Sequence, residues 1–343
     1  MLLFLCMNKK WIYKPIPDQE IVASLAESIN VNTTIASILV QRGIHDFDEA
    51  KYFFRPDITN LHDPFLMKDM DKAVERINDA IFNEEKIVVY GDYDVDGTTS
   101  VTMFYHFIKS FYDNVVYYIP DRYKEGYGVS QAGIEWADGN NGKLIVSLDC
   151  GVKANKMVAL AKSKGIDFIV CDHHNTPEIL PEAVAVLDPK RPDCEYPFKE
   201  LSGCGVGFKL MQALVMNNGM DDSVLYHYLD LLTISIAADI VPINGENRIF
   251  CFFGLKVLNA SPRAGVKALV DLLKTQSDLT ITNVVFGIAP KINAAGRIAH
   301  ATDVVKLLLA EDLELANLIS EEVNSRNNER KDIDASITQE AIE

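Results

Sequence analysis

The chain has 343 residues, of which 48% are hydrophobic and 24% are charged. These values are ordinary for a globular protein of about two domains, so they exclude a low-complexity chain and one that needs disulfides to fold. The formal net charge of −16 argues against a broadly basic surface for nucleic acid and by itself favours a small phosphorylated substrate. It still permits a local basic groove and a carboxylate-rich cation site.

The cysteines and the N-terminus indicate a cytoplasmic protein. The six cysteines are scattered without a CxxC pair, which is typical of reduced thiols. The apolar start, Met1–Cys6, is too short for a signal peptide and is followed by Lys9 and Lys10, and Met7 is an equally good start of translation. No apolar run approaches the roughly 20 residues that span a bilayer, so we expect no membrane partner.

The first part of the chain, residues 1–80, is predicted to be an N-terminal helical segment. Apolar residues recur at helical spacing in 21–29, 34–42 and 69–82. Between residues 81 and 245, short apolar runs without alternation, typical of strands buried on both faces, alternate with helical stretches. The expected strands are 87–90, 115–119, 144–148, 168–170 and 184–187, and the expected helices are 99–112, 130–136 and 154–164. This order predicts an α/β fold, a doubly wound and mostly parallel sheet with flanking helices.

The rest of the chain is predicted to be mostly helical. Helices are expected at 210–215, 225–238 and 248–258, and residues 283–310 are rich in Gly, Pro and Asn. The stretch from Asp312 to Glu343 is predicted to be a long polar helix with little to bury. It stops without a cap or a breaker, so we expect a connector that is cut mid-course, as in an expression fragment or an incomplete gene.

Acidic and histidine residues follow three of the predicted strands where each strand ends. An acid run follows the first of these strands, a single acid the second, and an acid with two histidines the third. Because the carboxyl ends of parallel strands meet at one edge of a sheet, these side chains are expected to lie together, with Asp239 as a further acid at the end of an apolar helix. The residues on the strands are Asp92, Asp94, Asp96, Asp149, Asp172, His173 and His174.

So many carboxylates in one cleft would repel each other unless cations neutralised them. Oxygen and imidazole ligands suit Mn²⁺ or Mg²⁺, and two such ions bridged by one carboxylate can activate a water and stabilise both oxygens of a phosphoryl displacement. Gly97 and Thr98 open the helix after the acid run, so their backbone N–H groups are candidates for contacting a phosphate.

Each motif has another interpretation when it is taken alone. The run from Asp92 resembles a calcium-binding loop, but its twelfth position is Met103 instead of the glutamate of an EF-hand. A single Asp at a strand end is commonly a helix cap, and His173 with His174 could be a surface pair. Three such motifs on successive strands favour a metal site.

Two further patterns have structural explanations that we prefer. Cys150 and Cys171 flank the metal motifs and could suggest zinc, but neighbouring side chains on a strand face opposite ways, so core thiols are expected. Gly203-x-Gly205-x-Gly207 resembles a dinucleotide fingerprint without a convincing strand before it, so close helix packing is expected.

Taken in chain order, these motifs resemble the signatures of the DHH phosphoesterase superfamily. Segments 119–130, 202–209 and 287–297 are similar to its RecJ branch, the single-strand-specific 5′→3′ exonucleases. The resemblance covers about residue 21 to the end, and it makes 81–245 the DHH catalytic core and 246–310 the helical remainder of the catalytic module. The motifs are Asp92-Tyr-Asp94-Val-Asp96-Gly97, Leu148-Asp149, Asp172-His173-His174, Asp239-Ile-Val-Pro242 and Asn293-Ala-Ala-Gly-Arg297.

The resemblance implies a role for each matching residue of the metal site. Asp94 and Asp96 would each hold one ion, and Asp149 would bridge the two ions and so take part in catalysis. His173 and Asp239 would complete the shell of the second ion.

The resemblance also implies roles around the metal site. His174 would act in catalysis beside the scissile phosphate, and Asp92 and Asp172 would orient the ligands. An arginine near the DNA 5′ end and another at the backbone are implied, since a guanidinium suits both tasks. The expected substrate-binding residues are Arg122, Arg297, Asn293, Gly97 and Thr98.

The chain departs from the family pattern at two points. Many superfamily members have a histidine four residues before the second motif acid, where this chain has Tyr90, so the first ion would be held more loosely or by water. RecJ-type enzymes also continue into a DHH-associated domain and an oligonucleotide-binding domain. Residues 311–343 are therefore expected to be a truncated connector helix toward a missing DHH-associated domain.

The resemblance implies a metal-dependent 5′→3′ exonuclease that hydrolyses single-stranded DNA to 5′-mononucleotides in recombination and repair. Its implied partners are single-stranded DNA, a single-strand-binding protein and a helicase. Two alternatives remain open. A DHH phosphatase or nanoRNase acting on short oligonucleotides, nucleotide phosphates or pyrophosphate would explain the acidity, and a non-catalytic DNA-binding relative would be expected to lose metal ligands that are all present here.

Overall fold

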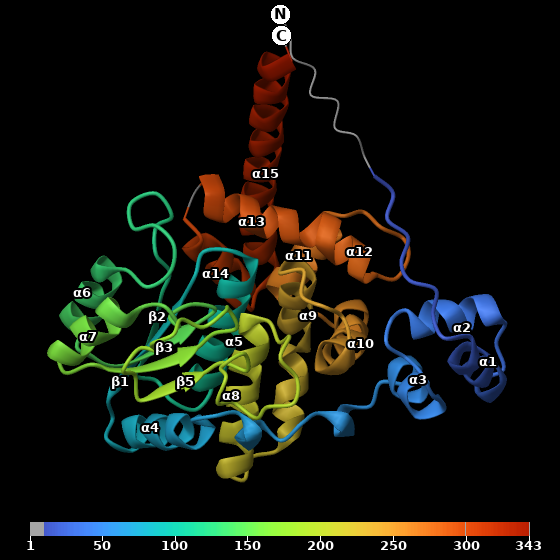
Figure 1. The fold of residues 1–343 in the computed structure, drawn as a ribbon. Helices are drawn as coiled ribbons and strands as arrows, with labels where there is room; N and C mark the ends of the chain where they lie inside the picture. Colours follow the sequence, from blue (N-terminus) through green and yellow to red (C-terminus); the bar gives the residue numbers. More distant parts are fainter. Residues whose placement is uncertain (1–9, 299, 343) are drawn as a thin grey trace, which may run out of the picture. The chain divides into compact units, whose positions relative to one another are not determined.

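The computed structural model describes residues 10–298 and 300–342, without the side chains of residues 295, 297 and 298 (Figure 1). The chain forms two compact units that divide after Asp57. In the first unit three helices begin at Asp18, Asn32 and Asp46, whose side chains accept hydrogen bonds from the first turn. These helices are α1 (Gln19–Ser28), α2 (Thr33–Val40) and α3 (Phe47–Phe54).

Helix α3 was absent from the prediction because it buries little. Only Ala50 of its eight residues is buried, so no apolar stripe is visible in the sequence. Helices α1 and α2 contribute Val22, Leu25, Ala36 and Leu39 to the same small core, and their apolar spacing did predict them.

The second unit is built on a five-stranded parallel sheet in the order β2-β1-β3-β4-β5. All five predicted strands are present, and the predicted doubly wound α/β fold is confirmed. The order reverses between β1 and β3, and such a switch point is where open α/β sheets bind ligands at their carboxyl edge. The strands are β1 (Lys86–Gly91), β2 (Val115–Tyr118), β3 (Gly142–Leu148), β4 (Asp167–Cys171) and β5 (Ala185–Leu187).

Both faces of the sheet are buried, because alternate residues of a strand enter different hydrophobic clusters. Ile87 and Val89 of β1 pack in one cluster, whereas Val88 and Tyr90 pack in the other. Helix α4 packs on the first face, which explains why the compact units divide after Asp57 and not near residue 80. The helices are α4 (Met70–Phe82), α5 (Val95–Lys109) and α8 (Gly203–Asn217) on the first face, and α6 (Gln131–Gly139) and α7 (Asn155–Ser163) on the second (Figure 1).

The C-terminal part is helical throughout most of its length, including the Gly/Pro/Asn-rich stretch. Pro290 is compatible with its helix because it lies in the first turn, where its missing N–H is not needed. Gly287 leaves room for Leu273, since a Cβ atom at position 287 would lie 2.7 Å from a side-chain carbon of that residue. The predicted long polar helix is present as α15. The elements are α9 (Leu229–Ala238), α10 (Gly245–Ala260), α11 (Ala264–Asp271), α12 (Ile281–Asn283), the π-helical η4 (Val284–Ile288), α13 (Ala289–Ile298), α14 (Thr302–Leu309) and α15 (Leu313–Ile342).

A buried ion pair connects this helical part to the sheet unit. Lys209 of α8 donates to the His62 carbonyl at 2.6 Å and lies 3.2 Å from Glu246 of α10. Tyr196 donates its hydroxyl to the other Glu246 oxygen at 2.6 Å. Because each charge is fully buried, removal of either partner would leave the other unpaired. Among the described residues, no helix is long and apolar enough to cross a membrane.

Candidate metal centre at the carboxyl edge of the sheet

The acid run after β1 turns directly into helix α5. Asp94 is the N-cap of α5, and its Oδ1 accepts a 2.9 Å hydrogen bond from the Gly97 N–H. A Cβ atom on Gly97 would lie 2.4 Å from the Asp92 carbonyl oxygen. Glycine therefore allows the chain to fold back on the end of the strand, and this brings the acids of the run together.

Asp96, in the first turn of α5, is held by two other helices. Its oxygens accept the N–H groups of Gly203 at 2.6 Å and Cys204 at 2.9 Å, at the N-terminus of α8. Ser235 Oγ of α9 donates to it at 2.6 Å. Because a helix N-terminus favours a negative charge, the N-terminus of α8 stabilises the Asp96 carboxylate and fixes its position.

Asp149 follows β3 in a strained conformation. Its φ of 61° lies in the left-handed region, which Asp adopts more readily than most residues but still at a cost. A Cβ atom on Gly203 would lie 2.5 Å from the Asp149 Cβ, so α8 starts with glycine to make room for this acid. The close packing expected for the Gly203-x-Gly205-x-Gly207 run is thus confirmed at Gly203.

Asp172, after β4, uses both oxygens to hold its loop. Oδ2 accepts the Val152 N–H at 2.9 Å, and Oδ1 accepts the His173 N–H at 2.8 Å and His174 Nδ1 at 2.7 Å. Burial opposes ionisation of Asp172, but the hydrogen bond from His174 lowers its pKa, and the same bond raises the pKa of His174. The Nδ1 proton is therefore fixed on His174, while Nε2 lies 3.2 Å from the Tyr127 hydroxyl.

His173 lies where the strand ends converge. Its Nε2 is 3.2 Å from Asp149 Oδ1, 3.6 Å from Asp239 Oδ2 and 3.7 Å from Asp96 Oδ2. Two groups of potential ligands, each with its ligand atoms within 4.8 Å of one another, share this histidine. One group is Asp149, His173 and His174, and the other is Asp96, His173 and Asp239.

The cluster is electrostatically unbalanced by itself. Asp149 Oδ1, Asp239 Oδ2 and His173 Nε2 are buried without a hydrogen-bond partner among the described residues, since the contacts of His173 lack hydrogen-bond geometry. Burial and the neighbouring carboxylates raise the pKa of Asp239 to about 8 and that of Asp149 well above its ordinary value. Burial lowers the pKa of His173.

Such a donor set fits divalent cations. Carboxylate oxygens and a neutral imidazole are ligands that Mn²⁺ and Mg²⁺ accept, and a cation would satisfy the unpaired atoms and offset the repulsion between the acids. The residues that could hold it are those of the two groups that share His173.

Three of the predicted site residues are used by the fold itself. Asp94 belongs to neither group of potential ligands, although its charge contributes to the raised pKa of Asp149 and Asp239. Thr98 is fully buried, and both its backbone N–H, at 3.0 Å, and its hydroxyl, at 2.7 Å, donate to the Asp94 carbonyl. The Gly97 N–H is taken by Asp94 Oδ1. Contrary to expectation, neither Gly97 nor Thr98 is open to a phosphate.

Tyr90 replaces the histidine of the family pattern and turns away from the cluster. Its hydroxyl donates to the Gly128 carbonyl at 3.1 Å and accepts the Ser130 N–H at 3.1 Å, and its ring stacks on Tyr118 with centroids 5.4 Å apart. Tyr90 therefore anchors the segment 119–130 and supplies no ligand atom to the groups that share His173.

The remaining predicted residues lie around the acid loop. Arg122 lies 5.0 Å above the Tyr93 ring, and its charge moderates the pKa of Asp92, which burial raises to about 7. Asn293 of α13 lines a pocket beside Asp239. The Arg297 side chain lies outside the described residues.

The cysteines beside the motifs pack in the core, as predicted. Cys171 joins the cluster under α4, α5 and α8, and Cys150 joins the cluster under α6 and α7. Both thiols are free and buried, and neither belongs to the potential metal-binding groups of the described residues.

Known proteins are similar to this chain in sequence and in fold. Residues 86–236 match the family model described as DHH family, N-terminal domain. The single-stranded-DNA-specific exonuclease RecJ of Bacillus subtilis is 40% identical over 330 residues, which is 95% of this chain and 41% of that protein. The chain therefore contains a DHH-family domain. RecJ of Escherichia coli is 34% identical over 80% of this chain and 50% of its own length, so this DHH-family chain spans about half the length of the curated relatives it matches, or less.

Solved structures of DHH-family proteins have the same fold. Exonuclease RecJ bound to manganese is 28% identical, with a TM-score of 0.75 over 83% of this chain and 71% of that one. RecJ of Thermus thermophilus in complex with Mn²⁺ is 25% identical, with a TM-score of 0.81 over 95% of this chain and 46% of that one. Both relatives hold manganese.

The sequence prediction overlooked residues of this DHH-family site. Asp188 follows β5 as Asp149 follows β3, and Leu187-Asp188 is the same signal as Leu148-Asp149. It is fully buried, its Oδ1 accepts the Lys190 N–H at 2.7 Å, and burial raises its pKa to about 7. Ser235 and Tyr127 carried no comparable signal, because the partner of a hydroxyl depends on tertiary packing.

Proposed function

We propose that the chain is the catalytic part of a metal-dependent exonuclease. It hydrolyses phosphodiester bonds of single-stranded DNA in the 5′→3′ direction to 5′-mononucleotides, in recombination and repair. The observation that carries the proposal is the convergence of Asp96, Asp149 and Asp239 on His173 with buried, unpaired ligand atoms. Similarity to RecJ exonucleases over 95% of the chain supports the substrate.

The proposed cofactor is a pair of Mn²⁺ or Mg²⁺ ions, which when bound activate water and stabilise charge on the phosphate oxygens. We assign the ligands to members of the two groups that share His173, without His174, together with Asp94, whose charge acts on Asp149 and Asp239. Asp149 would be the ligand shared between the ions. The proposed ligands are Asp94, Asp96, Asp149, His173 and Asp239.

His174 is the proposed residue at the scissile phosphate. The Asp172 carboxylate raises the pKa of His174, so the imidazolium form is favoured and Nε2–H can donate a hydrogen bond or a proton to a phosphate oxygen. Asp172 positions this ring, and Asp92 supports the acid loop from a buried site. Arg122, Asn293 and Arg297 are proposed contacts of the strand, and a single-strand-binding protein and a helicase are proposed partners on the family resemblance.

Degradation of end-labelled oligonucleotides tests this function. With Mn²⁺, a 5′-labelled single strand should release labelled mononucleotide at once, whereas a 3′-labelled strand should shorten stepwise, and EDTA should stop both reactions. The same sequence as a duplex should resist. Faster hydrolysis of a dinucleotide or of pyrophosphate would favour the small-substrate phosphatase, and metal-dependent binding of DNA without cleavage would favour the non-catalytic relative.

A further inference from the structure

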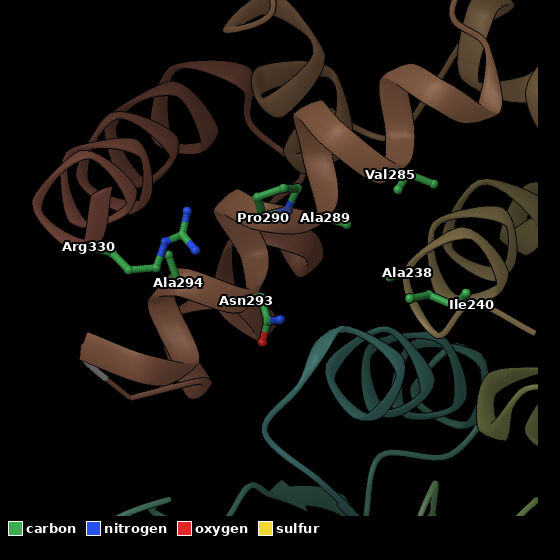
Figure 2. Close-up of a pocket in the computed structure, with 8 residues that line it drawn as sticks. All are labelled: Ala238, Ile240, Val285, Ala289, Pro290, Asn293, Ala294 and Arg330. Atoms are coloured by element: carbon green, nitrogen blue, oxygen red, sulfur yellow. The ribbon is translucent and has the colours of Figure 1, made fainter. Parts of the chain in front are cut away.

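A pocket of about 240 Å³ lies beside the metal centre, between the end of α9 and helices α13 and α15 (Figure 2). Ala238 and Ile240, the two neighbours of Asp239 in the chain, form one wall. Asn293 of α13 and Arg330 of α15 line the other side, where the Arg330 guanidinium extends toward α13 in Figure 2. The pocket therefore joins the metal centre to a charged side chain from the long helix.

Arg330 has hydrogen-bonding capacity that the described residues do not use. Its Nε is buried without a hydrogen-bond partner among them. Its ion pair is one contact of 3.6 Å, between Nη1 and Asp334 Oδ2, one turn further along α15. A guanidinium offers five N–H donors in a planar fork that matches phosphate oxygens, so Arg330 is suited to an anionic ligand in this pocket.

Two lysines increase the positive charge near Arg330. Lys291 lies on α13, two residues before Asn293, and Lys331 follows Arg330 on α15. Burial lowers the pKa of Lys291, and the charge of Lys331 lowers it further, so these helices hold cations close together. Neither lysine lines the pocket itself, and α15 also carries Glu329, Asp332 and Asp334 beside them, so Arg330 supplies the charged side chain of the pocket.

Ile240 gives the pocket an apolar wall at a conformational cost. Its φ is 61°, in the left-handed region that a β-branched residue rarely adopts, and its side chain is 86% exposed. Packing in the core does not explain this strain, because the side chain is outside the core. An exposed, strained apolar residue beside a reactive centre suits contact with a sugar or a base.

We propose that this pocket binds a phosphodiester group of the single-stranded DNA, with Arg330 and Asn293 at the phosphate and Ile240 against the adjoining sugar or base. This inference rests on the proposed function and adds Arg330 as a substrate-positioning residue. Because the pocket is bounded by the chain neighbours of Asp239 and not by the ligand atoms themselves, we assign it to a phosphate other than the scissile one.

Substitution of Arg330 tests the pocket, with Arg326 as the matched control. Arg326 lies one turn earlier on α15, pairs with Glu322 and is absent from the pocket lining. Binding of a short 5′-phosphorylated oligothymidylate is measured by fluorescence anisotropy in EDTA, where no hydrolysis occurs, over a series of salt concentrations. Arg330→Gln should raise Kd about tenfold and reduce the slope of log K against log salt by about 0.7, whereas Arg326→Gln should change neither.

A second substitution of Arg330 and a second ligand distinguish the possible results. Arg330→Lys should keep the salt slope and recover only part of the affinity, since a lysine lacks the fork. An unchanged Kd and slope for Arg330→Gln, or an equal loss for Arg326→Gln, would refute the pocket. An equal loss of affinity for free thymidine monophosphate would assign the contact to the released product and refute it as well.

The same experiment distinguishes this inference from the proposed function. If the unmodified chain binds the oligothymidylate but fails to hydrolyse it with Mn²⁺, the proposed function fails, and the binding comparison still decides the pocket. If it hydrolyses the strand while Arg330→Gln binds normally, only the pocket fails. If it does not bind the strand at all, both fail. Thermal unfolding of each variant shows that the fold is kept.

Discussion

The edge of the sheet and the pocket beside α13 and α15 have opposite electrostatic properties. At the sheet edge, backbone N–H groups and rigid strand ends hold carboxylates around unpaired atoms, as the contacts of Asp96 and Asp172 show. At the pocket, Arg330 of α15 has a buried Nε without a hydrogen-bond partner among the described residues. In our proposals the first site is completed by a cation and the second by an anion. If both proposals hold, hydrolysis and binding of the strand are carried out by different parts of the fold.

The largest expected effect tests this separation at the sheet edge. Asp149→Asn keeps the shape of the side chain, and Asn tolerates the φ of 61° at this position, so the fold should be retained. Loss of the carboxylate should lower kcat on single-stranded DNA by more than about a thousandfold. The Kd for the strand in EDTA should rise no more than about twofold, the reverse of the result for Arg330→Gln.

Kinetics and anisotropy on the same preparations check this prediction. Asp278→Asn, at an exposed position away from the strand ends, is the control and should match the unmodified chain. Near-normal turnover by Asp149→Asn would show that the bridging role is misassigned. A parallel loss of strand affinity would show that the two sites are not separate.

A smaller effect concerns stability without metal. The raised pKa values of Asp92, about 7, and Asp239, about 8, mean that the folded protein binds more protons than the unfolded chain above pH 4. Stability then falls as pH rises, so the Tm of EDTA-treated protein should drop between about pH 5 and pH 8. Mn²⁺ should restore most of the loss, and Asp239→Asn should flatten the pH dependence where Asp278→Asn does not. Calorimetry showing equal slopes for the two variants would contradict the electrostatic account of the site.

The smallest expected effect concerns Ile240 in the wall of the pocket. Ile240→Asn removes the β-branched residue from its left-handed conformation, and the protein should gain about 1 kcal/mol of stability, or about 2 °C in Tm. Affinity for the oligothymidylate should fall about threefold. Ile179→Asn is the control, because Ile179 is also exposed but lacks a positive φ. If Ile240→Asn bound the strand normally, the strain would have no part in holding DNA.

The fold was largely predictable because its strands are buried on both faces. Runs such as Ile87–Tyr90 are apolar without alternation, and this texture occurs almost only in parallel sheets covered by helices. The prediction of helices was incomplete where glycine or proline, which usually interrupt a helix, is retained because of tertiary packing. Gly203 and Gly205 concealed the first turns of α8, where Gly203 is needed because Asp149 lies against it. Pro290 and Gly287 likewise concealed helices in the Gly/Pro/Asn-rich stretch.

The candidate site was predictable at strand ends and not elsewhere. Asp149 and Asp172 could be selected because the carboxyl edge of a parallel sheet gathers whatever follows each strand. That Asp94 spends an oxygen as a helix cap, and that Thr98 turns its hydroxyl inward, depends on the first turn of α5 in three dimensions. The unpaired Arg330 Nε could not be predicted for the same reason, since in sequence Arg330 is one of two arginines on a polar helix.

One close contact fixes the position of α13 against the acid loop. A Cβ atom on Gly296 of α13 would lie 2.5 Å from the Tyr93 carbonyl oxygen, so the helix rests directly on the backbone of the acid loop. Glycine at position 296 therefore allows α13 to approach the acid loop this closely. A strand seated beside α13 would present its bonds to the acids at a constant interval, whatever its bases are.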